Sequence, residues 1–222
     1  MNNSVDKLNE QIKGIFQNVG LESISDAMNV LGIEGIIKGF TPTIPGEMVF
    51  GPIYTVKFEK CDIPEKCIAG DYIDDVPAGS IVVIDNDNWD YCTVWGNILA
   101  SVAQKRKIAG TVINGAARDF EVMKKIGYPL YSKHIGCRTG KGNVILKSVQ
   151  TALTIDGIDV MPNDYIVAQN GIALIIPKEK LENVVEKAIE INEMENKILH
   201  AVLYEEMSLR EARKKYRYNE VK

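Results

Sequence analysis

The sequence predicts an α/β protein with a partly parallel sheet and helical segments at both ends. Strand and helix patterns alternate from Ile81 to Ser132, as in βαβ units. Near both ends of the chain, apolar residues recur at helical spacing instead. The 222 residues, 45% hydrophobic and 25% charged, are enough for one sizeable globular core. We therefore expect a single domain over residues 1–222, with its core at about 23–177 and C-terminal helices at 178–218.

Composition also limits the function. A formal net charge of −4 argues against a basic nucleic-acid-binding face, so no direct nucleic-acid contact is expected. No window reaches roughly 18 uninterrupted apolar residues, and the polar N-terminus has no signal-peptide core. These features predict a cytoplasmic protein without a membrane segment. The cysteines lack C-x-x-C spacing and are expected to be free thiols: Cys61, Cys67, Cys92 and Cys137.

Glycine and proline punctuate the first quarter of the chain and set the limits of its elements. The expected elements are a helix over Val5–Val19 that ends at Gly20, a second helix from Ser23 or Ser25 to Gly32, a loop with Pro42 and Pro45, and a strand over Met48–Phe58 with a bulge or kink at Gly51-Pro52.

The middle of the chain alternates between buried strands and short helices. The helix that begins near Gly96 should pack through a stripe of Ile98, Ala100, Val102 and Ala103. The expected elements are a strand over Ile81–Ile84, the helix from Gly96 that ends before Gly110, a strand over Thr111–Ile113, a short helix ending at Gly127, and a strand at Leu130-Tyr131.

The last third changes character. Short β-rich pieces over residues 143–176 are separated by turns, which predicts a mainly antiparallel sheet or small barrel. Beyond Pro177 a long helical pattern runs to about Glu206, and its apolar stripe needs a partner surface such as the protein's own sheet. A final short helix follows, in which Ser208 and Glu211 form a capping box.

Arg118-Asp119 lies at the tip of a predicted buried strand, where the next helix begins. Such strand-to-helix turns are where ligands bind in α/β sheets. The arginine fork matches a carboxylate or enolate, and an adjacent aspartate can bind a divalent ion through oxygen. Taken alone, the dipeptide is also explained by an ordinary ion pair at a helix start.

Gly96 opens a helix directly after Trp95. Such a start leaves free backbone N–H groups and the positive end of a helix dipole, which together suit a carboxylate or phosphate. The alternative is that Gly96 only caps the helix and Trp95 fills the core.

Two further signals are assigned to structure. Residues 138–143, RTGKGN, imitate a phosphate-binding loop, but they lack the Walker spacing and the Ser/Thr after the lysine. We expect a basic turn between strands there. His134, just past a predicted strand, is expected to be a hydrogen-bonded structural residue rather than a catalyst.

Together these segments resemble the RraA-like family, which includes 4-hydroxy-4-methyl-2-oxoglutarate aldolases and oxaloacetate decarboxylases. The specific part is WGN…GTVINGAARD, within Val82–Asp119. Weaker pieces follow in family order (SISDAM, PAGSIVVID and DGIDVMPNDYIVAQNGIALIIP), so the resemblance covers most of Ser23–Pro177. It implies a compact ββα swivelling-domain-like fold that assembles into trimers or hexamers, with active sites at subunit boundaries.

The resemblance also implies an activity, that of a metal-dependent class II aldolase or decarboxylase acting on a small 2-oxo acid through a pyruvate enolate. The metal would be Mg²⁺ or Mn²⁺. In this chain the matching positions are Gly96, Asn97, Ile98 and Leu99 for binding the 2-oxo acid, Arg118 for contacting the substrate, and Asp119 for binding the metal.

This chain departs from the family pattern at two places. Family enzymes usually carry a carboxylate where this chain has Asn97, and a glycine-rich stretch where it has Asn86–Trp89. Other members resembling this chain bind and inhibit a ribonuclease without lyase activity, and that branch lacks the residue matching Asp119. Asp119 therefore favours the lyase, and Asn97 favours the ribonuclease-binding alternative. A lyase acting on a sugar acid or another 2-oxo acid is a third possibility.

Overall fold

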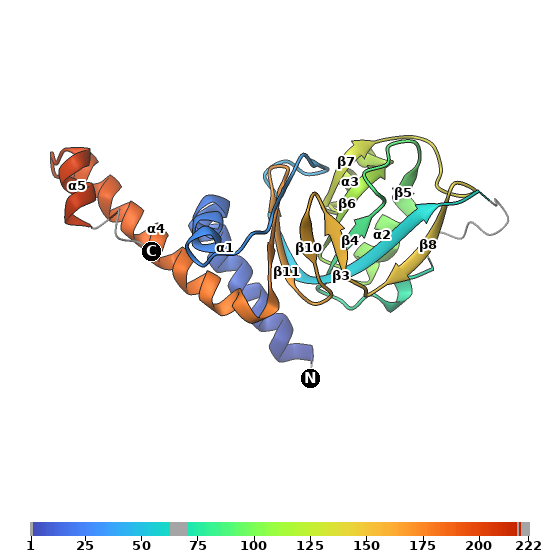
Figure 1. Cartoon of the computed structure of the whole chain (residues 1–222), viewed down its shortest axis with the longest axis horizontal. Coiled ribbons are helices and arrows are strands. Elements are labelled where there is room, and N and C mark those ends of the chain that lie inside the picture. Colours follow the sequence, from blue (N-terminus) through green and yellow to red (C-terminus); the bar gives the residue numbers. More distant parts are fainter. Residues whose placement is uncertain (1, 63–70, 217, 219–222) are drawn as a thin grey trace. The chain divides into compact units, whose positions relative to one another are not determined.

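The computed structural model describes residues 2–62, 71–216 and 218, with side chains from residue 7 onward (Figure 1). The chain divides into two compact units, one of residues 1–34 and 179–222 and the other of residues 35–178. None of the described helices has the length and apolar character needed to cross a bilayer.

The first unit is helical. It consists of α1 (Asn2–Val30), α4 (Leu181–Tyr204) and α5 (Leu209–Lys215). Gly20 interrupts α1 with a left-handed φ of 83°, so two helical stretches flank it as predicted. The second stretch begins directly after Gly20 rather than at Ser23 or Ser25. A left-handed residue cannot continue the helix, and glycine adopts this conformation without steric cost.

Within the helical unit, α4 packs against α1. Buried side chains of both helices meet there, and they are Phe16, Ile24 and Met28 of α1 with Leu181, Val184, Ala188 and Ile191 of α4. The predicted capping box of α5 is confirmed. The Glu211 N–H donates to Ser208 Oγ at 3.3 Å, and the Ser208 N–H donates to Glu211 Oε2 at 3.0 Å.

The second unit is built on a sheet with the strand order β1-β12-β11-β3-β4-β6-β7-β2. In addition, β5 lies beside β6 and β8 beside β3, while β9 and β10 form a separate hairpin. The strands are β1 (Ile36–Lys38), β2 (Thr41–Pro42), β3 (Val49–Lys60), β4 (Ile81–Asp85), β5 (Thr93–Trp95), β6 (Gly110–Ala117), β7 (Leu130–Ile135), β8 (Val144–Val149), β9 (Leu153–Ile155), β10 (Ile158–Val160), β11 (Tyr165–Gln169) and β12 (Ile172–Ile176).

The middle of the sheet is parallel, because β3, β4, β6 and β7 pair in that order and direction. The crossovers carry α2 (Asn97–Lys105) and α3 (Phe120–Ile126). Strands β8, β11 and β12 join in antiparallel pairs. The predicted βαβ units and the antiparallel final third are therefore confirmed, as is the α/β class with helices at both ends. Every residue of β4 and β6 is buried, so the carboxyl ends of these strands emerge from the core at one edge.

A bulge or kink was expected at Gly51-Pro52, and the prediction of a bulge is wrong. Strand β3 pairs regularly with β11 through both residues, and its register shift against β8 falls between Lys57 and Phe58. Gly51 is needed for space instead, because a Cβ there would lie 2.5 Å from the carbonyl oxygen of Gly79.

The α2 stripe is confirmed in part. Ala100 and Ala103 are fully buried and Val102 is half-buried, but Ile98 is 73% exposed. Ile98 belongs to the first turn, which faces a pocket rather than the sheet.

The free-thiol prediction is wrong for Cys61, which is disulfide-bonded. Disulfide formation depends on which side chains the fold brings together, and spacing in the sequence does not give that. Cys92 and Cys137 are free thiols, as predicted, and Cys67 lies outside the described residues. Burial raises the pKa of the Cys92 thiol, and nearby Arg138 partly opposes the shift.

Candidate active site

Arg118 and Asp119 follow directly on the buried strand β6. The Arg118 N–H donates to the carbonyl oxygen of Trp95 at 3.0 Å, which ties the strand end to β5. Asp119 adopts the left-handed conformation (φ 62°, ψ 34°) and precedes α3. This conformation costs a residue other than glycine on the order of 1 kcal/mol. It turns the chain sharply and leaves both side chains at the strand tip, partly exposed.

The start of α2 meets this dipeptide. The Asn97 N–H donates to Asp119 Oδ2 at 3.0 Å. A Cβ at Gly96 would lie 2.9 Å from the same oxygen and 3.0 Å from Arg118 Nε. The backbone of Gly96 is extended (φ −161°), so the glycine is required for space and not for its conformation. The fold thus brings together the two segments that the sequence analysis singled out.

A pocket of about 340 Å³ opens beside Arg118. Its lining includes Trp95 to Leu99 and residues 139–141. The Ile98 and Leu99 N–H groups have no acceptor in the described part of the chain, so the helix start offers donors to a ligand. The Trp95 ring stacks on Tyr128 with 5.9 Å between centroids, which fixes one wall of the pocket against the core. All four residues predicted to bind the 2-oxo acid line this pocket, as does Arg118.

The loop at residues 139–141 forms a wall that the sequence analysis missed. Thr93 holds it, because the Thr93 N–H and Oγ1 both donate to the carbonyl oxygen of Arg138, at 3.0 Å and 2.9 Å. A Cβ at Gly140 would lie 2.5 Å from the Thr93 carbonyl oxygen, so only glycine permits this approach. Lys141 makes no ion pair with any described residue. The turn predicted from RTGKGN is therefore present, and it carries a second cation into the pocket lining.

Arg118 and Asp119 form a loose pair. Arg118 Nε and Asp119 Oδ2 are 3.7 Å apart, which is too far for a hydrogen bond. The two side chains are 37% and 34% exposed. The guanidinium fork is therefore left available for an anionic ligand. Asp119 itself does not line the pocket but lies behind Gly96 at its edge.

Whether a divalent ion fits here follows from the available ligands. No three His, Cys, Asp or Glu residues gather as a ligand set within the described residues. Mg²⁺ often binds through one or two carboxylates and retains several waters. Asp119 supplies one carboxylate, and the exposed Asn97 adjoins it without adding charge. The residues fit an ion held by Asp119, water and substrate oxygens, and they do not fit one enclosed by protein ligands.

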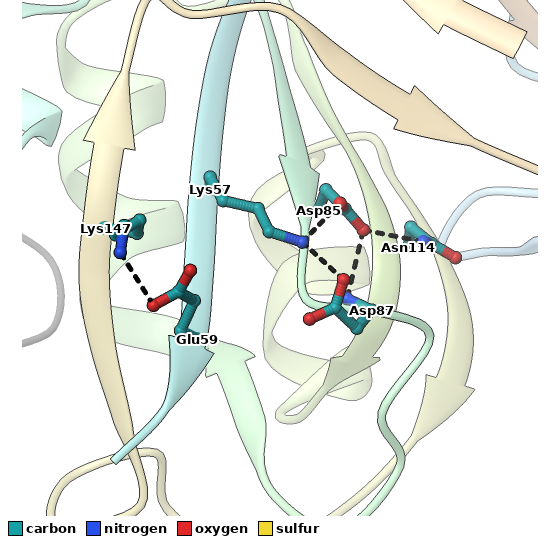
Figure 2. A network of polar contacts seen from close by, with 6 residues as sticks. All are labelled: Lys57, Glu59, Asp85, Asp87, Asn114 and Lys147. Atoms are coloured by element: carbon teal, nitrogen blue, oxygen red, sulfur yellow. Dashed lines mark hydrogen bonds and ion pairs between the residues drawn. The ribbon is translucent and has the colours of Figure 1, made fainter.

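A second cation–carboxylate cluster lies at the end of β4, where Lys57 of β3 pairs with Asp85 (Figure 2). Lys57 Nζ donates to Asp85 Oδ2 at 2.7 Å and also to Asp87, and Asn114 Nδ2 donates to Asp85 Oδ1 at 2.7 Å. Burial alone would lower the pKa of Lys57, but its hydrogen bonds to the two aspartates outweigh burial and raise it. This lysine stays protonated and holds the turn through its hydrogen bonds to Asp85 and Asp87.

His134 is hydrogen-bonded, as predicted. Its Nε2 lies 2.8 Å from Asn88 Oδ1, in the turn that follows β4. This contact and the Lys57 cluster both fall on the turn that follows β4. The turn at Asn86–Trp89 is anchored by side chains.

Fold and site together define an α/β protein with a cation-lined pocket at the tips of parallel strands. Residues 22–174 match the model of the RraA-like family, described as Aldolase/RraA. The chain therefore belongs to the RraA-like family, and the predicted RraA-like fold is confirmed.

Individual relatives agree with this assignment. The chain is 36% identical over 205 residues to Protein DlpA of Legionella pneumophila, covering 91% of this chain but only 33% of that protein. It therefore spans about a third of that relative's length. A protein of Halalkalibacterium halodurans, named as a candidate 4-hydroxy-4-methyl-2-oxoglutarate aldolase, is 27% identical over 78% of this chain and 80% of its own length. The crystal structure of an uncharacterized protein from Pseudomonas syringae superposes with a TM-score of 0.84, at 33% identity, covering 93% of this chain and 94% of that one.

Proposed function

We propose that this chain is a metal-dependent carbon–carbon lyase that cleaves or decarboxylates a small 2-oxo acid. The observation that carries the proposal is the arrangement of Arg118 and the start of α2 around one pocket, with Asp119 at the edge of that pocket. Relatives named for an aldolase of this class support it. The substrates considered are of the 4-hydroxy-4-methyl-2-oxoglutarate and oxaloacetate types.

The pocket suits the anionic groups of such a substrate. The free N–H groups of Ile98 and Leu99 would hold the C1 carboxylate at the positive end of α2. Lys141, which has no ion-pair partner among the described residues, would face a second carboxylate. Cleavage of the C3–C4 bond leaves the enolate of pyruvate, which is then protonated at C3. The other product is CO2 from oxaloacetate, or a second pyruvate from 4-hydroxy-4-methyl-2-oxoglutarate after its C4 hydroxyl has given up its proton. The Arg118 fork would stabilise the charge that develops on the 2-oxo oxygen.

Asp119 would hold the divalent ion, Mg²⁺ or Mn²⁺, with water and substrate oxygens. When bound, such an ion supplies the positive charge that draws electrons from the breaking bond. Because Asn97 brings no charge to the site, one carboxylate would carry the protein's share of the binding. We also expect a cytoplasmic trimer or hexamer, as the family resemblance implies.

A second candidate is a protein without lyase activity that binds and inhibits a ribonuclease. The uncharged Asn97 favours it, because this residue adds no negative charge beside Asp119. Asp119 and the open pocket favour the lyase.

The deciding assay is pyruvate release from oxaloacetate and from 4-hydroxy-4-methyl-2-oxoglutarate, with Mg²⁺ and with EDTA. We expect turnover with Mg²⁺, loss of turnover in EDTA, and loss in Asp119→Ala with the fold intact by circular dichroism. Full activity of the EDTA-treated protein or of the variant would exclude the metal mechanism. Absence of turnover on both substrates, with inhibition of a ribonuclease, would establish the second candidate.

A further inference from the structure

One carboxylate in the lining of the pocket has no partner within the described part of the chain. Asp71 precedes the short helix η2 (Ile73–Asp75), and both Asp71 and Ile73 line the pocket beside Arg118. Asp71 is exposed and forms no hydrogen bond or ion pair with a described residue. Of the described residues that line the pocket, it is the one that carries a carboxylate. Its capacity to accept a proton or a hydrogen bond is therefore unused.

The backbone that carries Asp71 is anchored on the far side from the pocket. Tyr72 and Ile73, the next two residues, are buried in the core under the sheet. Helix η2 is also tied to the end of α2, because Arg106 Nη1 lies 3.6 Å from Asp74 Oδ1 and Arg106 Nη2 donates to the Asp74 carbonyl oxygen. A carboxylate on such a fixed backbone can be held in the geometry that catalysis requires.

Aldol cleavage needs a group that accepts a proton, and the other charged groups of the pocket are donors. When the C3–C4 bond of 4-hydroxy-4-methyl-2-oxoglutarate breaks, C4 becomes the carbonyl carbon of the second pyruvate, so the C4 hydroxyl must lose its proton. The Arg118 guanidinium, the Lys141 ammonium and the N–H groups at the start of α2 donate and do not accept. Asp119 lies outside the pocket lining and is engaged with the start of α2.

We propose that Asp71 is the general base of aldol cleavage, an inference that rests on the proposed lyase function. The Asp71 carboxylate takes the proton of the C4 hydroxyl while the C3–C4 bond breaks. The electron pair of the O–H bond forms the new carbonyl group, and the pair of the C–C bond passes into the enolate that Arg118 stabilises. The enolate then takes a proton from water at C3, and Asp71 returns its proton to water, so the protons balance.

The two proposed substrates separate this step from the steps that they share. Oxaloacetate has no C4 hydroxyl, and its decarboxylation to the same enolate requires no base. In Asp71→Asn we therefore expect kcat for 4-hydroxy-4-methyl-2-oxoglutarate, divided by kcat for oxaloacetate, to fall about a hundredfold, as is typical for loss of a general base. Both rates are measured as pyruvate release at saturating Mg²⁺, with the fold checked by circular dichroism.

The matched control is Asp75→Asn. Asp75 lies in the same segment and is exposed, but it does not line the pocket, so its variant should leave both rates and their ratio unchanged. A second test is chemical rescue of Asp71→Ala by formate, compared with chloride at equal ionic strength. A small carboxylate that enters the vacated space can accept the proton. Formate should therefore raise the rate of aldol cleavage several-fold and leave that of decarboxylation as it is.

Four results would overturn the inference. Three concern the variants: a ratio in Asp71→Asn within about threefold of the wild type, an effect confined to KM, and no response of Asp71→Ala to formate. The first would make Asp71 a group that both reactions share, such as a metal ligand, or one without a role, and the second would make it a binding residue. The fourth is a wild-type protein that decarboxylates oxaloacetate but does not cleave the aldol substrate, which leaves the proposed function in place. A wild-type protein inactive on both substrates would overturn the proposed function as well.

Discussion

Two cation–carboxylate pairs lie at the tips of neighbouring strands of the parallel sheet, and they differ in the distance between the partners and in their exposure to solvent. At the end of β4, Lys57 and Asp85 are 2.7 Å apart, and the Asp85 side chain is 6% exposed. At the end of β6, Arg118 and Asp119 are 3.7 Å apart and each is about a third exposed. The residue types are similar. What separates the pairs is whether their hydrogen-bonding capacity is used within the protein.

The Asp85 carboxylate is saturated. It accepts from Lys57, from the Asn114 amide and from the Asp87 N–H, so a ligand would have to displace an existing bond. Asp119 accepts one backbone N–H, and the arginine beside it has no hydrogen bond to it. A closed pair stabilises a fold, whereas an open one beside a pocket can bind.

The largest expected effect of this difference is on stability. Asp85→Ala leaves the Lys57 ammonium partly buried without its main partner, which should lower the free energy of unfolding by about 3–5 kcal/mol. Asp119→Ala loses one bond at the start of α2, for which about 1 kcal/mol is expected. Urea denaturation of both variants measures the contrast. Equal destabilisation would mean that the pair at β6 is also a structural one.

The next effect is on catalysis. If Arg118 stabilises the enolate, Arg118→Ala should lower kcat/KM for oxaloacetate about a hundredfold, or about 3 kcal/mol. Arg118→Lys should not restore it fully, because an ammonium cannot reproduce the fork. Lys147→Ala, which breaks only the exposed pair with Glu59, is the control and should be neutral. A change of less than threefold in both Arg118 variants would reduce the pair to a surface ion bridge.

The sequence alone located most of the fold and half of the pocket, for identifiable reasons. Buried strands such as β4 and β6 are continuous apolar runs, and glycines end the helices between them. The hydrophobic pattern is therefore sufficient to predict these elements. Arg118 and Gly96 could be paired because both lie where a strand meets a helix. The specific part of the family resemblance, WGN…GTVINGAARD, covers the same two strand-to-helix turns.

The other half of the pocket needed contacts that no local pattern encodes. Lys141 reaches the site because Gly140 lets its loop approach Thr93, a contact between segments far apart in the chain. The RTGKGN stretch lacks the Walker spacing, so the sequence predicts only a basic turn there and gives no sign that its lysine lines a pocket. Helical spacing predicts Ile98 in the packing stripe because it does not show where a helix leaves the sheet, whereas the family resemblance predicts Ile98 in the binding site.

The smallest predicted effect concerns Asn97, where the family pattern is broken. Its N–H lies 3.0 Å from Asp119 Oδ2, so a carboxylate at position 97 would stand beside the proposed metal ligand. A charge a few ångströms from a divalent ion is worth about 1 kcal/mol or more, even in a partly wet site. Asn97→Asp should therefore tighten Mg²⁺ binding about tenfold and raise turnover at limiting metal.

Titration of Mg²⁺ against both proteins, together with KM for oxaloacetate, distinguishes this role of Asn97 from two others. If Asn97 contacts a polar group of the substrate, the new charge repels an anion and raises KM without tightening the metal. If it only supports the start of α2, aspartate there interacts well with the helix dipole, and catalysis changes little. Unchanged metal affinity in a folded variant would separate Asn97 from the metal. The loose pair at β6 would then have no demonstrated link to lyase chemistry, which would favour the ribonuclease-binding candidate.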